Sequence, residues 1–72
     1  MEVVSESNTA GEMMRRVRTF LAGGSREVWV IYPRERQVWI YQSARQAQAY
    51  SGKFRSDLLP GIEIDLDAIL GA

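Results

Sequence analysis

Apolar residues recur at helical spacing in one segment of this 72-residue chain and in continuous or alternating runs elsewhere. A helix is predicted over residues 9–22. Its apolar stripe consists of Met13, Val17, Phe20 and Leu21. Thr9 and Glu12 have the spacing of a capping box, in which the threonine accepts from an early backbone N–H and the glutamate reaches back. Gly23 and Gly24 then end the helix, because glycine tolerates the positive φ of a helix C-terminus.

Extended segments are predicted on both sides of this helix. Residues 1–5 are β-branched at their centre, and residues 27–32 form a nearly continuous apolar run, as in strands buried on both faces. After a turn at residues 33–36, residues 37–41 return as an antiparallel strand. A strand, a helix and a strand within about 30 residues are typical of a βαβ unit, which the hairpin extends.

The C-terminal third carries weaker signals. Residues 47–50 are expected to be extended, and residues 62–66 alternate apolar and acidic side chains, as a half-exposed strand does. Asp67 is placed to cap a terminal helical turn over residues 68–70. The predicted fold class is therefore α/β in a single domain, residues 1–72: a strand-helix-strand unit, an antiparallel hairpin and a C-terminal strand.

Charge and composition exclude several classes of binding and catalytic site. Nine Lys and Arg balance nine Asp and Glu, which argues against a strongly basic nucleic-acid wrapper. The chain has no cysteine and no histidine, which excludes a disulfide scaffold, a thiolate zinc site and Ser-His-Asp catalysis. A bound metal ion would therefore need oxygen ligands, as Mg²⁺, Mn²⁺ and Ca²⁺ do.

The sequence gives no sign of membrane attachment. Its longest apolar run, residues 28–32, is far shorter than the ~20 residues of a membrane span. The N-terminus also lacks the charged-then-apolar order of a signal peptide. A cytoplasmic protein without a membrane partner is expected.

Glu2 and Arg16 are charged residues in informative places. Glu2 lies in a strand beside two valines, where an unpaired charge is costly, so it is either an exposed glutamate of an edge strand or a ligand. Arg16 flanks the apolar stripe of the helix, from where its head group can reach the neighbouring strand. Arg15 and Arg18 point away from the stripe and are expected to form a solvated face. Phosphate contacts by all three arginines are the less favoured alternative.

Other polar and aromatic candidates have structural interpretations. The capping box accounts for Glu12, and the solvated face of a strand accounts for Glu63, Asp65 and Asp67. Trp29 and Trp39 lie in the two hairpin strands, where aromatic residues act as stacking platforms for single-stranded nucleic acid or as core. A core or interface role is favoured for both, because so short a domain needs their apolar area.

Three blocks of the sequence together resemble the C-terminal half of the Uma2 family of restriction-endonuclease-like bacterial proteins. They are residues 1–9, 12–16 and 24–33, which read MEVVSESNT, EMMRR and GSREVWVIYP. Ser5 and Ser7 match the family's Ser-Pro-Ser turn, with Glu6 where proline is usual. Residues 58–66 are similar to the usual ending of the family, so the resemblance covers essentially the whole chain.

The resemblance implies a metal-dependent nuclease site of the PD-(D/E)XK superfamily. In that superfamily an Asp of an earlier strand, a Glu of the next strand and a main-chain carbonyl hold Mg²⁺ or Mn²⁺, and a Lys positions or activates the water that hydrolyses a DNA phosphodiester. Glu2 matches the strand glutamate, Val3 would supply the carbonyl, and Arg16 matches the lysine. The resemblance thus gives Glu2 and Arg16 as catalytic residues, and Glu2 and Val3 as metal ligands.

Two departures from the family change the expected function. The half that carries the metal-binding Asp is expected to be absent, because Met1 stands within the strand of Glu2. Arg16 keeps its positive charge and cannot act as a base, although it can stabilise phosphoryl charge. We therefore expect a truncated restriction-endonuclease-like domain that does not hydrolyse DNA as a single chain. The alternative is a non-catalytic homo-oligomeric module that binds DNA or protein.

Self-association is expected for such a domain. Loss of the first half would expose apolar residues of the sheet such as Val3, Val28, Val30 or Trp29, and a second copy would cover them. A homodimer or a larger closed oligomer is predicted, with residues 1–5 or 27–32 near the contact.

Overall fold

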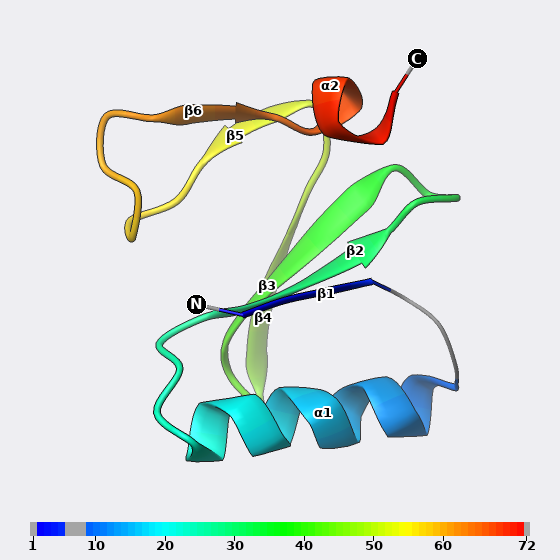
Figure 1. The fold of residues 1–72 in the computed structure, drawn as a ribbon, viewed down its shortest axis with the longest axis vertical. Helices are drawn as coiled ribbons and strands as arrows, with labels where there is room; N and C mark the ends of the chain where they lie inside the picture. Colours follow the sequence, from blue (N-terminus) through cyan, green and yellow to red (C-terminus); the bar gives the residue numbers. More distant parts are fainter. Residues whose placement is uncertain (1, 6–8, 72) are drawn as a thin grey trace.

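A four-stranded mixed sheet forms the centre of the computed structural model, which describes residues 2–5 and 9–71 (Figure 1). Its strands, in spatial order, are β1 (Glu2–Ser5), β2 (Val28–Tyr32), β3 (Gln37–Ser43) and β4 (Gln46–Tyr50). β1 pairs with β2 in parallel, and the other pairs are antiparallel. The predicted strand-helix-strand unit followed by an antiparallel hairpin is confirmed. Met1, Glu6 and Ser7, which belong to the predicted first strand and the Uma2-like turn, lie outside the described residues.

Helix α1 (Ala10–Ala22) connects the two parallel strands and covers one face of the sheet. Thr9 is its N-cap, and the Thr9 Oγ1 accepts a hydrogen bond of 3.3 Å from the Glu12 N–H. Two apolar residues of the predicted stripe, Met13 and Val17, are buried in one cluster with Val4 of β1 and with Val28 and Val30 of β2. The helix is thus placed by its local signals, a polar cap at the start and an apolar stripe along one side.

A second, smaller layer covers the opposite face of the sheet (Figure 1). It consists of β5 (Lys53–Arg55), β6 (Glu63–Asp65) and α2 (Leu66–Leu70), with β5 and β6 paired antiparallel. The core cluster between this layer and the main sheet contains Trp29, Val38, Ile40, Phe54 and Leu66. Because this layer lies opposite α1, β2 is buried on both faces, as its continuous apolar run predicted.

The C-terminal segment differs from the prediction in three ways. The observed strand is shorter than predicted, and it pairs with the unpredicted β5 in a separate two-stranded sheet. The N-cap of α2 is Asp65, whose Oδ1 accepts from the Ala68 N–H at 3.2 Å, so the predicted cap Asp67 is wrong. Helix formation starting at Leu66 turns that side chain into the core, whereas Asp67 faces the guanidinium of Arg36.

The predicted exposure of the sheet is correct for one residue and wrong for three. Val3 is 50% exposed, but Val28, Val30 and Trp29 are buried because α1 and the C-terminal layer cover them. The core prediction is therefore confirmed for Trp29. Trp39 is 38% exposed and lines a surface pocket, so it does not belong to the core, and the interface role that was the other alternative for it stays a prediction. Among the described residues, no helix has the length and apolar character needed to cross a membrane.

Candidate functional site

Glu2 lies at an outer edge of the main sheet. Glu2 is half-buried and belongs to β1, whose one neighbour among the described strands is β2. Its N–H donates to the Glu27 carbonyl at 3.1 Å. Glu2 pairs with Val28, and Val4 with Val30, so Glu2 and Val4 share the face covered by α1. The expected edge-strand position of Glu2 is confirmed, but the residue is half-buried and not exposed as expected, and its role as a ligand stays a prediction.

The backbone of Val3 faces the free edge of β1. Residues along a strand direct their N–H and C=O groups alternately to one side and the other. The Glu2 N–H donates to the carbonyl of Glu27, the residue immediately before β2. The N–H and C=O of Val3, the next residue, therefore point away from β2. The carbonyl that the Uma2 resemblance assigns to a metal is therefore directed outward, where an added strand or ligand can reach it.

Arg16 lies on α1, next to the buried Val17, and its side chain is exposed. The helix covers the face on which Glu2 lies, so the two predicted site residues belong to adjacent layers. Among residues 2–5 and 9–71, however, no ion pair joins them, and the one ion pair connects Arg36 to Asp67. The structure places Glu2 and Arg16 on the same side of the sheet without bringing them into contact.

The described residues alone do not fit a complete magnesium site. Mg²⁺ demands octahedral oxygen coordination and in proteins usually takes one or two carboxylates together with substrate phosphates. β1 offers one carboxylate, from Glu2, and the outward carbonyl of Val3. Within the described part of the chain, no group of three or more acidic residues is arranged to hold a metal ion.

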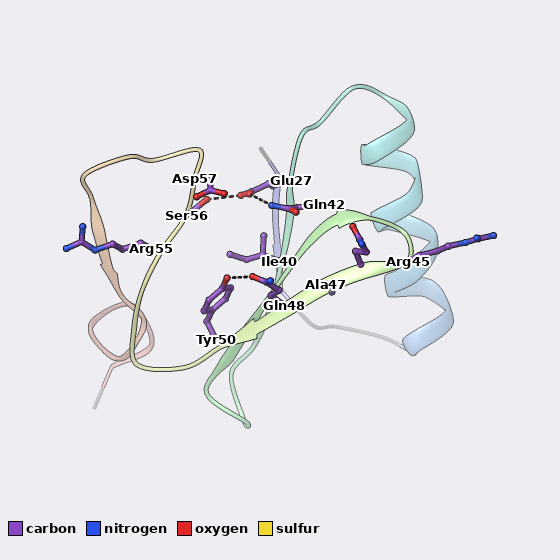
Figure 2. A pocket seen from close by; sticks show the side chains of 11 residues that line it. Glu27, Ile40, Gln42, Arg45, Ala47, Gln48, Tyr50, Arg55, Ser56 and Asp57 are labelled. Atoms are coloured by element: carbon purple, nitrogen blue, oxygen red, sulfur yellow. Dashed lines mark hydrogen bonds between the residues drawn. The ribbon is translucent and has the colours of Figure 1, made fainter.

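A buried carboxylate that the sequence analysis did not single out lies at the opposite face of the sheet (Figure 2). Glu27, immediately before β2, is 4% exposed. Its Oε1 accepts hydrogen bonds of 2.9 Å from the Trp29 Nε1–H and from the Ser56 hydroxyl, and its Oε2 accepts a longer one of 3.4 Å from the Gln42 amide. Glu27 thus joins the start of β2, the end of β3 and the segment after β5.

The sequence contained a weak signal for Glu27. It begins the continuous apolar run and stands two residues before Trp29, which places both side chains on the same face of the strand. A charge at the start of a strand that is buried on both faces needs hydrogen-bond donors. The donors Gln42 and Ser56 lie 15 and 29 residues further along the chain, and no local pattern identifies them.

Glu27 also lines a polar pocket of about 470 Å³ between β4 and the segment that follows β5. Gln42 and Ser56 lie with it at one end, while the tips of Arg45 and Arg55 project away from the pocket (Figure 2). At the other end Tyr50 donates a short hydrogen bond to Gln48, and its ring stacks on Phe54 with centroids 5.1 Å apart. Through its bonds to Trp29 of β2 and to Ser56 after β5, the Glu27 carboxylate connects the main sheet to the C-terminal layer.

The fold is that of a mixed α/β protein. Its main sheet has an open edge at β1, near Glu2 and Val3, and a buried carboxylate, Glu27, on the face opposite α1. No protein-family model matches the chain, and no curated protein matches it either. Membership of the Uma2 family therefore stays an expectation from the sequence blocks at residues 1–9, 12–16 and 24–33.

Proposed function

We propose that the chain is a Uma2-like, restriction-endonuclease-like protein whose residues supply half of a divalent-cation site, and that a second copy pairs with β1 to supply the other half. A single chain then does not hydrolyse DNA. The observation that carries this proposal is the position of Glu2 and Val3. Both lie on the outer strand of a parallel β1-α1-β2 unit, where Glu2 is half-buried and the Val3 carbonyl faces outward.

The backbone and side chain of Val3 favour a second copy of the chain at the edge formed by β1. The outward N–H and C=O groups of Val3 are free to form ladder hydrogen bonds, and its side chain is 50% exposed. An antiparallel pair of β1 strands centred on Val3 keeps both Glu2 side chains on the face covered by α1. Diagonal neighbours across such a pair lie about 7–8 Å apart, close enough for two carboxylates to share one cation. The shared cation would also relieve the repulsion between the two carboxylates.

A non-catalytic homo-oligomeric module is the second candidate function. Exposed arginines on α1 favour DNA as its partner, since Arg15, Arg16 and Arg18 all have exposed side chains. Contacts from such residues to phosphates give affinity without sequence readout. This candidate uses the same β1 contact and differs in having no cation between the two copies.

Substitution of Val3 by proline is expected to convert the dimer into a monomer without unfolding it. The Val3 N–H makes no bond to β2, so proline removes only the donor needed by an added strand. Val3→Ala is the matched control, because it shortens the side chain and keeps the N–H. Sedimentation across micromolar concentrations should give a dimer for the wild type and for Val3→Ala, and a folded monomer for Val3→Pro. A wild type that is a folded monomer, or a dimer that persists in Val3→Pro, contradicts the β1 contact.

A calorimetric titration with Mn²⁺ distinguishes the two candidate functions. The proposed shared site should take one ion per two chains, and Glu2→Gln should abolish this binding because it removes both carboxylates. Glu63→Gln, at an exposed acid on β6, should bind as the wild type does. A β1-dependent dimer that shows no Glu2-dependent Mn²⁺ binding would instead be the non-catalytic module.

A further inference from the structure

A second pocket, of about 310 Å³, lies on the same face of the main sheet as α1. It is lined by Tyr32, Glu35, Gln37, Trp39 and Tyr41. Three of these residues are aromatic, and Glu35 is the charged member of the lining. The volume falls at the lower end of the range for small-molecule sites, about 300–1,000 Å³.

The sheet register holds the three rings together. Trp39 and Tyr41 are two residues apart on β3 and so share a face, and Tyr32 lies diagonally across from Trp39 on β2. The Tyr32 and Trp39 rings have centroids 6.2 Å apart and planes inclined at 68°, an edge-to-face arrangement. Both tyrosines are half-buried against the core cluster under α1. Two walls of the pocket are therefore anchored by the core.

Trp39 presents an aromatic surface to solvent. Its Nε1–H donates to the Gln37 Oε1 at 3.3 Å, which orients the indole. Within the described residues, the ring contact of Trp39 is the one with Tyr32, and no arginine or lysine stacks on its indole. An exposed indole beside a second ring is the best aromatic surface for a cation, because its face is electron-rich.

The charges at this pocket favour a cation. Glu35 belongs to the turn between β2 and β3 and is one of the residues that line the pocket. Arg36, the next residue, is held on the other side of the sheet, where its guanidinium donates to Asp67 at 3.0 Å and to the Gly71 carbonyl at 2.6 Å. Arg34 is exposed and does not line the pocket. The electron-rich ring faces and the negative charge of Glu35 therefore both attract a positively charged ligand.

We propose that this pocket binds a small organic cation with a methylated ammonium head group. The methyl groups contact the rings of Tyr32, Trp39 and Tyr41, and Glu35 balances the charge. Nucleobase stacking is less suited to this geometry, because a nucleic-acid strand brings phosphates toward Glu35 and the inclined rings do not form a flat platform. This inference does not depend on the β1 edge or on a divalent cation.

The test is a titration of the ¹⁵N-labelled protein with choline and with 3,3-dimethylbutan-1-ol, its neutral carbon analogue. The two tryptophan indole N–H resonances report on separate places, since Trp29 is buried beside Glu27 and Trp39 lines the pocket. Choline should shift the Trp39 resonance and leave that of Trp29 unchanged, whereas the neutral analogue should bind at least about threefold more weakly. Free trimethyllysine should also shift Trp39, because it carries the same head group.

Variants connect the binding to particular side chains. Trp39→Leu should weaken choline binding by about 3- to 30-fold, the range of cation–π interactions, as followed through ligand resonances. Glu35→Gln should weaken it less, and Glu12→Gln, an exposed acid on α1, should leave it unchanged. Equal affinity for choline and its neutral analogue, or an unshifted Trp39 resonance at saturating choline, overturns the proposal. A single-stranded oligonucleotide that shifts Trp39 when choline does not would show a base-stacking surface instead.

Discussion

Replacement of Leu66 by alanine should lower the free energy of unfolding by about 2–5 kcal/mol. Leu66 is 1% exposed and is the first residue of α2. Its side chain belongs to the cluster that joins the C-terminal layer to the main sheet, together with Trp29 and Phe54. Truncation removes buried methyl groups and leaves a cavity between layers that cannot fully close. For a domain of this size such a loss is a large part of the total stability.

The loss should appear first in the C-terminal layer. Leu66 also fixes this layer through its backbone, since its N–H donates to the Gly52 carbonyl at 2.9 Å. Hydrogen exchange should therefore accelerate in β5 and β6 before it does in α1, which packs on the opposite face. Trp29 fluorescence should change together with β5, because its ring packs against Phe54 with centroids 5.5 Å apart.

Ile69 provides the matched control for Leu66. It lies on the same short helix but is 63% exposed, so Ile69→Ala should change the unfolding free energy by no more than about 0.5 kcal/mol. Urea denaturation monitored by circular dichroism measures both variants. If Leu66→Ala does not fold, Leu66→Met keeps the volume and should cost less than about 1.5 kcal/mol. Equal losses at Leu66 and Ile69 would mean that the C-terminal layer does not depend on this contact.

The parts of the fold that local signals determine could be predicted from the sequence. Thr9 is the observed cap of α1, and the stripe through Met13 and Val17 is buried as its spacing required. The apolar run of β2 is buried on both faces. In these segments the capping residue, the hydrophobic period and the turn all favour the same structure, so neighbours in the sequence are sufficient.

The C-terminal segment could be predicted less well because its structure depends on distant contacts. Residues 62–66 alternate apolar and acidic side chains, which favours a strand, but the chain turns into a helix at Leu66. Burial of Leu66 against the main sheet and capping by Asp65 together outweigh the alternation. β5 is only three residues long and has one buried residue, Phe54, so its own pattern is too short to identify a strand.

The candidate sites likewise divide into residues that local sequence identifies and residues that depend on distant contacts. Glu2 was identifiable because an acid beside valines in a strand is unusual, and the resemblance to Uma2 proteins named the same residue. Glu27 was not identified, because its donors come from β3 and from the segment after β5. The aromatic pocket likewise depends on strand register, which brings Tyr32 beside Trp39. Sequence alone favoured a core or interface role for Trp39, and the sheet leaves it partly exposed.

Replacement of Glu27 by alanine should lower the free energy of unfolding by about 2–4 kcal/mol. The change removes the acceptor of the Trp29 Nε1–H and of the Ser56 hydroxyl, both of which donate at 2.9 Å. A buried donor without an acceptor costs about 1–3 kcal/mol. Water from the adjacent pocket can reach Ser56, which lines it, so the larger share of the loss should come from Trp29. The Trp29 indole N–H should exchange with solvent much faster than in the wild type.

Glu27→Gln separates the hydrogen bonds from the charge of this carboxylate. The amide oxygen can still accept from Trp29 and Ser56, while its NH₂ group turns toward the Gln42 amide, which can rotate to present its own oxygen. This variant should therefore lose less than Glu27→Ala, and Glu63→Ala, at an exposed acid on β6, should stay within about 0.5 kcal/mol of the wild type. Urea denaturation compares all three. If Glu27→Ala is as stable as Glu63→Ala, the two layers are held together by apolar packing alone, and the buried carboxylate has another role.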